Sequence, residues 1–577
     1  MSIPFSEQSK QTTAGLSNRP FWEKSYPLGV SSETPLGPPV AVESFLEKAA
    51  ERWPDAEAID FYDYSISYKE LYQLAAKAAK GFQAIGVRPG VNVGLHLLNT
   101  PHYVICAFGV LMAGGCVVSF SPHSAPRELQ EQLIDVEARV IVTLDRASLY
   151  NHIAPLKGVG SLETVVVCSI EDFLPAEVTK KFLIAPVVAR KLGAGREIDF
   201  SELIANDGLY TVYSHQSLEE ENAAIAYSGG TTGEPKGAML THANFSAIVD
   251  IYLLWTSKSY WPEVCKALVV LPLCHIFGFA SIMMLVVATG SVLVLHLGFD
   301  VNRVLADIDR KKITTFAGVP TMYSMLVNHS KIKEFNLSSL TDCNVGGAPL
   351  PDEVLYRFRE LTGLTPQLSY GLTETTALAA LQITDGEPRA GTSGLPLPHT
   401  LIEIVDLETG TRVLPVGEQG EICCSGPHVM KGYWKKPEET AKAFYGGRFH
   451  TGDIGFLDSD GYLTIVDRKK DMIITGGYNV FPRNVEKVIS EHPSVAEAMV
   501  VGIADPGLGQ VLKVFLEMKP GCEPLKYNQL RAFLTDKLAS YEIPAEMEIR
   551  SALPKTAVGK LSKKDLVGED QAKQSRA

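Results

Sequence analysis

Residues 227–237, YSGGTTGEPKG, combine glycines, hydroxyl side chains and one lysine in a single short segment. Glycines allow backbone N–H groups to approach an anion, while Thr231, Thr232 and Lys236 add hydroxyl donors and a positive charge. The segment follows an apolar strand-like run at 223–226 and precedes a helix-like run. We predict a phosphate-binding loop, although a glycine-rich surface turn of the same composition stays an open alternative.

Two common nucleotide-binding motifs do not match this chain. Lys236 is followed by Gly237, and no glycine stands four residues before a Gly-Lys-Ser/Thr string, so the loop is not a Walker A motif. The nearest dinucleotide fingerprint, Gly507-x-Gly509, has Leu512 where its third glycine belongs. A conventional P-loop ATPase and a Rossmann dehydrogenase are therefore disfavoured.

Five polar residues elsewhere have the right types for chemistry, and each also has an ordinary interpretation. Glu374 could start a helix, Asp453 could occupy a turn, and Arg468 could belong to a solvated basic run. His275 lies in an apolar stretch that favours a core histidine, and Lys560 lies in a polar segment near the end of the chain. None of these residues indicates a site by itself.

Taken together, the loop and six further strings resemble the adenylate-forming family of acyl-CoA synthetases, luciferases and peptide-synthetase adenylation domains. The strings follow in that family's order: PLCHIFG at 272–278, GGAPL at 346–350, YGLTE at 370–374, TGD at 451–453, DRKKD at 467–471 and PKTAVGKL at 554–561. The resemblance covers roughly residues 20–565. FWEKSYP at 21–27 and GAPL at 347–350 are most similar to bacterial fatty-acyl-CoA ligases.

The resemblance implies a two-step ligase that uses ATP, Mg²⁺ and coenzyme A. The carboxylate of an acid attacks the α-phosphorus of ATP, pyrophosphate leaves, and the thiol of coenzyme A then takes the acyl group from the adenylate and releases AMP. The first step gathers several anions, so cations, oriented amides and a metal must offset their repulsion. This requirement explains the residue types in the strings.

The resemblance also implies a role for individual residues. Residues carried over as ATP- or CoA-binding are Ser228, Gly229, Gly230, Thr231, Thr232, Gly233, Lys236, Gly347, Ala348, Tyr370, Gly371, Thr373, Asp453, Arg468, Gly476 and Gly477. Glu374 is implied to hold Mg²⁺, for which oxygen ligands are suitable. Lys560 is implied to bridge the carboxylate and the α-phosphate, and His275 to orient the acyl carboxylate, so with Thr231 and Glu374 they form the expected catalytic set.

The roles within this set differ in kind. Thr231, Thr232 and Lys236 are implied to hold the β and γ phosphates, Tyr370 to lie near adenine, and Asp453 to accept hydrogen bonds from the ribose. Arg468 would bind the ribose or phosphate region. Gly347 and Ala348 would form a close-packed wall of the acyl pocket, and Gly476 and Gly477 would offer a backbone edge to the pantetheine arm.

The order of sequence patterns predicts an α/β fold with two domains. Helical patterns at 44–52 and 68–85 alternate with short apolar strands at 91–97 and 138–144, as in a wound, largely parallel sheet. After residue 398, runs at 401–405, 420–425 and 462–466 predict a small barrel-like antiparallel part. We expect a large ATP- and acyl-binding domain at 1–466 and a smaller, mobile α+β domain at 467–577, with the hinge at Asp467.

Composition narrows the setting in which the protein works. The net charge of −13 argues against a nucleic-acid partner, and nine cysteines without CxxC pairs indicate neither a zinc site nor a disulfide framework. Residues 267–299 carry no charge and are long enough to span a bilayer, but Pro272, His275, Gly278 and Gly290 divide them into buried strand, loop, helix and strand. We expect a cytoplasmic enzyme, and peripheral membrane contact and a homodimer stay open.

The substrate is the least determined part of the prediction. We expect a medium- or long-chain fatty acid, with an aryl or dicarboxylic acid as the alternative for the same ATP machinery. A peptide-synthetase adenylation module is less favoured because no carrier domain follows Lys560. From a different class, a non-catalytic acyl- or nucleotide-binding protein is disfavoured by the intact Lys236, Glu374, Asp453 and Lys560.

Overall fold

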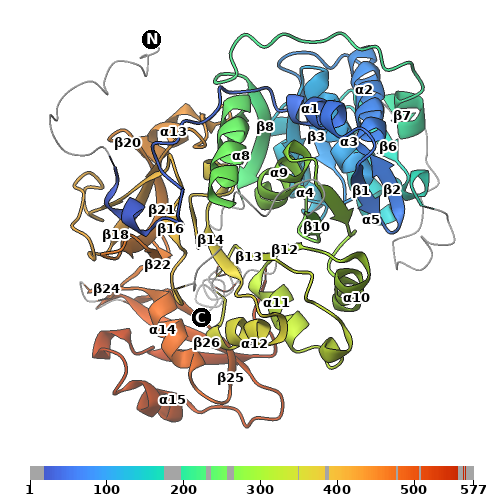
Figure 1. Ribbon diagram of the computed structural model, residues 1–577. Coiled ribbons are helices and arrows are strands. Elements are labelled where there is room, and N and C mark those ends of the chain that lie inside the picture. Colours follow the sequence, from blue (N-terminus) through green and yellow to red (C-terminus); the bar gives the residue numbers. More distant parts are fainter. Residues whose placement is uncertain are drawn as a thin grey trace.

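The computed structural model describes residues 19–174, 196–228, 236–256, 265–348, 350–383, 389–475, 478–505, 508–555, 563 and 566. Within these residues, four sheets and their covering helices form the molecule (Figure 1). The mixed α/β architecture, with a large N-terminal part and a smaller C-terminal part, confirms the predicted fold class.

The first sheet has eight strands among the described residues, in the order β19-β9-β8-β4-β3-β5-β6-β7. Strands β8 to β7 in that order run parallel, whereas β9 and β19 join antiparallel at one edge. The strands are β3 (Asn92–His96), β4 (Cys116–Ser119), β5 (Val140–Leu144), β6 (Thr164–Cys168), β7 (Arg196–Asp199), β8 (Asn222–Ser228), β9 (Lys236–Thr241) and β19 (Gly432–Tyr433). Their helices are α2 (Tyr68–Ala84), α3 (Pro101–Met112), α4 (Pro126–Asp135), α5 (Ala147–Ile153) and the short α7 (Phe200–Leu203).

The second sheet has nine strands among the described residues, in the order β16-β15-β14-β13-β12-β10-β11-β1-β2. Its central strands from β14 to β1 run parallel. The strands are β1 (Glu57–Phe61), β2 (Tyr64–Ser67), β10 (Lys266–Val269), β11 (Val292–Leu295), β12 (Thr315–Gly318), β13 (Asp342–Val345), β14 (Gln367–Tyr370), β15 (Ala380–Leu381) and β16 (Leu395–Pro396). The helices are α1 (Ser44–Arg52), α8 (His242–Thr256), the π-helical η4 (Phe277–Met284), α9 (Leu285–Ala288), α10 (Val301–Lys311), α11 (Pro320–Val327) and α12 (Asp352–Thr362).

The long uncharged run at 267–299 lies inside this second unit. It forms β10, η4, α9 and β11, which confirms the predicted strand, loop, helix and strand. The rings of Tyr103 on α3 and Phe245 on α8 both pack against Phe279 of η4. The apolar character is therefore explained by burial between helices and sheet. In the described parts of the chain, no helix combines the length and the apolar character needed to cross a bilayer.

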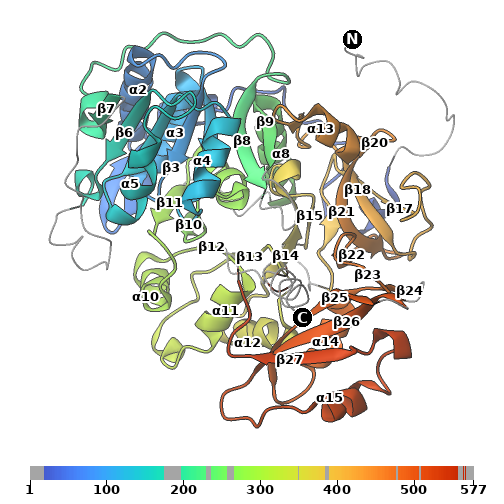
Figure 2. The same cartoon turned by 180° about the vertical axis from the view of Figure 1, so that it is seen from behind.

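Two smaller sheets complete the molecule. The third is antiparallel and contains β17 (Leu401–Val405), β18 (Gly420–Ser425), β20 (Phe444–Tyr445), β21 (Arg448–Leu457) and β22 (Leu463–Arg468), close to the predicted runs. The fourth contains β23 (Ile473–Thr475), β24 (Tyr478–Val480), β25 (Val495–Asp505), β26 (Gly509–Met518) and β27 (Glu546–Arg550), with α14 (Pro482–Ser490) and α15 (Tyr527–Leu534). Figures 1 and 2 show this last part as a separate layer beside β22.

Candidate active site

The described residues on either side of the phosphate-loop segment belong to two antiparallel strands, β8 and β9. Strand β8 ends at Ser228 and β9 begins at Lys236, and these two residues are direct partners in the register. A helix follows the loop as predicted, since α8 begins at His242. The short strand β9 comes before it and pairs with β8 on one side and β19 on the other. Outside the described residues lie Gly229, Gly230, Thr231, Thr232 and Gly233.

Lys236 and Glu374 meet at one tyrosine. The ammonium of Lys236 lies 5.3 Å from the ring centroid of Tyr433 and pairs with the carboxylate of Glu439. The Tyr433 hydroxyl donates a hydrogen bond to Oε1 of Glu374 at 2.8 Å. Burial, and then the charge of Glu374, raise the pKa of Tyr433 far above its usual range, so the phenol stays a donor. Cation, aromatic ring and buried carboxylate thus form one unit.

Tyr433 lies outside the motifs that resemble the family. It belongs to β19, which reaches β9 from almost two hundred residues further along the chain and pairs Tyr433 with Ala238. The neighbouring Trp434 N–H donates to the carbonyl of Gly237, next to Lys236, at 2.8 Å. Two adjacent aromatic residues, Tyr433 and Trp434, follow Gly432 in the sequence and could have drawn attention to this position. Only the pairing of β19 with β9 shows what these two side chains contact.

A second cluster joins Tyr370, Asp453 and Arg468. The Tyr370 hydroxyl donates to Oδ2 of Asp453 at 2.8 Å, and Nε of Arg468 lies 2.9 Å from Oδ1 of the same carboxylate. Asp453 and Arg468 are direct partners between β21 and β22. The Asp453 charge raises the pKa of Arg468. Asp453 is only 4% exposed, whereas the Arg468 side chain is 41% exposed and reaches the surface of the site.

A glycine allows two backbone segments to lie close together around Glu374. Glu374 lies in a 3₁₀ turn (Thr373–Thr375) that follows β14, and its backbone carbonyl accepts the N–H of Met430 at 2.8 Å. A Cβ atom at Gly371 would lie 1.8 Å from the carbonyl oxygen of Ala377, so only glycine fits. The turn can therefore bring the buried carboxylate beside the strand β19.

The expected acyl-side residues lie around η4. His275 precedes this helix, and its Nδ1 accepts the backbone N–H of Phe277 at 3.2 Å. A Cβ atom at Gly346 would lie 2.7 Å from the Phe277 ring, so this glycine allows the ring to pack on β13. Gly347 has a φ of 86° and, like Ala348, is exposed. β13 therefore ends at Val345, with Gly346 buried and the chain turning at Gly347 and Ala348.

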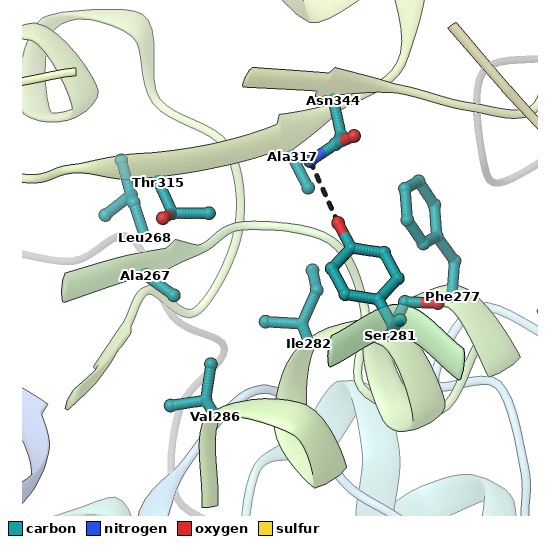
Figure 3. Close-up of a pocket in the computed structure, with 10 residues that line it drawn as sticks. Ala267, Leu268, Phe277, Ser281, Ile282, Val286, Thr315, Ala317 and Asn344 are labelled. Carbon is teal, nitrogen blue, oxygen red and sulfur yellow. Dashed lines mark hydrogen bonds between the residues drawn. The ribbon is translucent and has the colours of Figure 1, made fainter. Parts of the chain in front are cut away.

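An apolar cavity adjoins Phe277, as Figure 3 shows. Side chains from α8, η4, α9, β10, β12 and β13 line it. They leave a volume of about 10 Å³, which is room for about one water molecule. An acyl group would therefore have to move side chains to enter.

Asp467 lies where the third sheet ends and the C-terminal part begins. It is 1% exposed, and its carboxylate accepts the N–H groups of Arg468 and Arg483 at 2.7 and 2.8 Å. Arg483 belongs to the first turn of α14, so one side chain connects β22 with the C-terminal part. Outside the described residues lie Gly476, Gly477 and Lys560.

Comparisons with known proteins agree with this geometry. The family model described as AMP-binding enzyme matches residues 46–434, and the model described as AMP-binding enzyme C-terminal domain matches 484–560. A crystal structure of ATP-bound MatB from Rhodopseudomonas palustris superposes with a TM-score of 0.80 at 26% identity, covering 91% of this chain and 98% of that one.

Curated relatives extend over nearly the whole chain. A long-chain-fatty-acid–CoA ligase from Bacillus subtilis (strain 168) is 36% identical over 560 residues, which are 95% of this chain and 98% of the relative. A feruloyl-CoA synthase from an Amycolatopsis species is 32% identical and covers 88% of this chain and 95% of its own length. The family predicted from the sequence motifs is thus confirmed. The chain belongs to the AMP-binding enzyme family.

Proposed function

We propose that this protein is an AMP-forming acid–CoA ligase that converts a medium- or long-chain fatty acid to its CoA thioester through an acyl-adenylate. The observation that carries the proposal is the convergence of Lys236 and Glu374 on Tyr433 in a chain of this family. The relative from Bacillus subtilis, named as a long-chain-fatty-acid–CoA ligase and matched over 95% of this chain, supports the choice of substrate.

The first cluster can bind the triphosphate and its metal. Lys236 supplies a positive charge where β9 begins, next to the loop, and there it would attract the β and γ phosphates together with the Thr231 and Thr232 hydroxyls. Glu374 would hold Mg²⁺: the Tyr433 hydroxyl occupies a site on Oε1, and the carboxylate keeps acceptor capacity for a hard cation. When bound, that ion would neutralise charge on the phosphates. Positioning and charge stabilisation supply most of the expected acceleration.

The second cluster can hold the nucleoside. The carboxylate of Asp453 already accepts from Tyr370 and pairs with Arg468, which fixes its orientation while lone pairs remain for the two ribose hydroxyls. Tyr370 is buried and so presents a rigid surface on which adenine would lie. The exposed part of Arg468 would reach the ribose or the α-phosphate. His275 would orient the acyl carboxylate beside it.

For the second half-reaction, we propose a division at residue 467 with domains 1–466 and 467–577. Lys560 would bridge the carboxylate and the α-phosphate during adenylate formation and then leave as the smaller domain turns about Asp467. Gly476 and Gly477 would then offer backbone groups to the pantetheine arm of coenzyme A. The supporting observation is that the Asp467 carboxylate, near the end of β22, accepts N–H groups both from β22 and from the first turn of α14.

We place the enzyme in the cytoplasm, where ATP and coenzyme A are available, with peripheral membrane contact as the route to a lipid acid. The test is a panel of acids from octanoate to palmitate, with benzoate-type and dicarboxylic acids beside them, supplied with ATP, Mg²⁺ and coenzyme A. Pyrophosphate release and mass spectrometry of the thioesters identify reaction and substrate together. Turnover of benzoate-type acids alone would contradict the fatty-acid assignment and favour the aryl alternative.

A further inference from the structure

The chain that follows Lys560 is attached to the C-terminal part by two side chains. Lys563, three residues after Lys560, places its Nζ 3.2 Å from Oε1 of Glu486 on α14. Leu566 is 1% exposed and packs in an apolar cluster with Val501 of β25. Lys563 and Leu566 are both helical, and a spacing of three residues places them on one helix face. That face is therefore fixed against α14 and β25.

The ion pair between Glu486 and Lys563 is largely shielded from solvent. The two side chains are 17% and 21% exposed, so dissolved ions screen their attraction only weakly. Oε1 of Glu486 also accepts the backbone N–H of Val500 on β25 at 2.8 Å. Nζ of Lys563 is buried and makes no hydrogen bond with a described residue, so the attraction is electrostatic. Burial raises the pKa of Glu486, and the charge of Lys563 opposes that rise.

Helix α14 connects this ion pair to the expected hinge. The carboxylate of Asp467 accepts the N–H of Arg483 in the first turn of α14, and Glu486 follows about one turn later. After burial, the charge of Asp467 is a further cause of the raised pKa of Glu486, so the two carboxylates lie near each other. A continuous path of contacts thus leads from Asp467 through α14 and Glu486 to Lys563.

The chain is fixed before Lys560 as well as after it. Leu553 is 4% exposed and belongs to the same apolar cluster as Leu566. Its backbone N–H donates to Oε2 of Glu517 on β26 at 3.0 Å. Lys560 therefore belongs to a short length of chain whose two ends are attached to the same sheet. Of the side chains that attach the end after Lys560, only Lys563 carries a charge.

We propose that Glu486 is a positioning residue for adenylate formation: through its ion pair with Lys563 it holds the chain that carries Lys560, so that this lysine moves together with α14. The inference rests on the acid–CoA ligase function proposed above, in which Lys560 acts only in the first step. Because a lysine side chain is long and flexible, the position of its backbone decides where the ammonium can reach. A displacement of about 1 Å at the reacting atoms can cost about 100-fold in rate.

The test measures the two half-reactions separately in full-length variants. Pyrophosphate release from ATP and Mg²⁺, with the acid of highest wild-type turnover in the panel above, measures the first step. Thioester formation from the synthetic adenylate of that acid and coenzyme A measures the second. In Glu486→Gln the side-chain oxygen can still accept from Val500, but the charge that attracts Lys563 is lost. We expect the first rate to fall about 10- to 100-fold and the second to stay within about 2-fold of the wild type.

Changes at Lys563 show whether the charge pair carries the effect. Lys563→Met should reproduce the loss in the first step, whereas Lys563→Arg keeps the charge and should keep most of the rate. The double variant Glu486→Gln/Lys563→Met should lose no more than either single variant, because the two residues act through one contact. Lys537→Met is the matched control. Lys537 pairs with Glu491 at 2.7 Å in the same part of the chain, but these side chains are 38% and 53% exposed, so both rates should be unchanged.

The outcomes separate this inference from the function on which it rests. Thermal melting identifies the variants that are folded, and Lys563→Met serves as the second variant where Glu486→Gln does not fold. An unchanged first step in a folded variant would overturn the inference. Equal losses in both steps, or a larger loss in the second, would also overturn it and leave the ion pair as a stabilising contact only. Absence of pyrophosphate release by the wild type with every acid would instead contradict the ligase function, and this inference with it.

Discussion

The carboxylate of Asp467 accepts the backbone N–H of Arg483 at 2.8 Å, across the boundary between β22 and α14. The first N–H groups of a helix have no partner within the helix, and the positive end of the helix dipole lies there, so a buried carboxylate is a favourable ligand. The same carboxylate accepts the N–H of Arg468 on its own strand. The expected hinge residue therefore also anchors the C-terminal part in the orientation seen here.

Asp467→Ala should loosen the start of α14. Without the carboxylate, the N–H of Arg483 loses its acceptor, and we expect hydrogen exchange in the first turn of α14 to accelerate roughly 5-fold, as for loss of a helix cap of about 1 kcal/mol. Exchange measured by mass spectrometry on the full chain checks this. Asp536→Ala, at an exposed aspartate near α15, is the control. Unchanged exchange at α14 would show that the contact contributes nothing to anchoring.

Tyr433→Phe should weaken the binding of Mg²⁺ at Glu374 while it keeps the aromatic ring next to Lys236. The change deletes only the hydroxyl that donates to Glu374, so the buried carboxylate loses its fixed orientation. We expect the Mg²⁺ concentration for half-maximal pyrophosphate release to rise several-fold, since a second-sphere hydrogen bond orients a metal ligand. Tyr433→Leu, which also removes the ring, should lower activity further. An identical Mg²⁺ curve for the phenylalanine variant would argue against Glu374 as the metal ligand.

Asp453→Asn should reduce discrimination between ATP and its deoxy analogues. The wild-type carboxylate can accept from both ribose hydroxyls, whereas an amide offers one oxygen and leaves Arg468 without its charged partner. We expect kcat/KM for ATP to fall by about 10- to 100-fold, from loss of roughly two hydrogen bonds to a charged group. The fall should be smaller with 2′-deoxy- and 3′-deoxy-ATP. Equal losses with all three nucleotides would place Asp453 away from the ribose.

Lys560→Ala should separate the two half-reactions. If the lysine acts only while charge develops between carboxylate and α-phosphate, its loss removes adenylate formation and spares thioester formation from supplied acyl-adenylate. Pyrophosphate release measures the first step, and thioester formation from synthetic adenylate measures the second. Lys555→Ala, whose side chain pairs with Glu497 in the C-terminal part, is the nearby control. Equal loss of both steps would contradict a role limited to the first.

The pH dependence of stability should reflect buried neutral histidines. Burial lowers the pKa of His428 to about 4, and burial with the nearby charges of His152 and His123 lowers that of His96 to about 3. In the unfolded chain both titrate near pH 6.5. Between about pH 6.5 and 4 the unfolded state binds more protons, so each histidine lowers the free energy of unfolding by up to about 1.4 kcal/mol per pH unit as pH falls.

His428→Leu should therefore flatten part of this dependence. We expect its melting temperature to change less than that of the wild type between pH 7 and 4.5, because one buried group that resists protonation is gone. Melting curves across that range provide the comparison, with His329→Leu, at a half-buried histidine that bonds Asn302, as control. The same pH slope in wild type and variant would mean that His428 is protonated in the folded state.

Local sequence patterns were sufficient to predict those helices and strands whose secondary structure is determined by neighbouring residues. Ser67 and Glu70 form a capping box at the start of α2, and the alternation at 401–405 and 420–425 matches β17 and β18. Pairings between distant segments could not be predicted this way. Strand β9, between the loop and α8, is an example, because its partner β19 lies almost two hundred residues further along the chain.

In the candidate site, too, some residues could be predicted from the sequence, whereas others are recognised only from contacts between distant segments. Motif resemblance was enough to select Glu374, Asp453 and Arg468, but it said nothing of Tyr433, which only the sheet edge brings between Lys236 and Glu374. Nor did the motifs point to Asn344 and Ser281 in the cavity beside Phe277, where Oδ1 and Oγ have no hydrogen-bond partner among the described residues. Asn344 lies in a short strand next to the GGAPL string, and its free oxygen is recognisable only from the direction in which Asp342 holds its amide.

The register between β21 and β22 has a mechanical consequence. Asp453 is bonded across the ladder to Arg468, and Arg468 follows the anchored Asp467 directly in the chain. A rotation of the backbone at residue 467 would strain the contacts between β21 and β22. A ribose bound to Asp453 would hold these contacts more firmly in place. The resistance of the two strands to twisting would then depend on the bound nucleotide. Rotation of the C-terminal part would in this way be coupled to the presence of the adenylate.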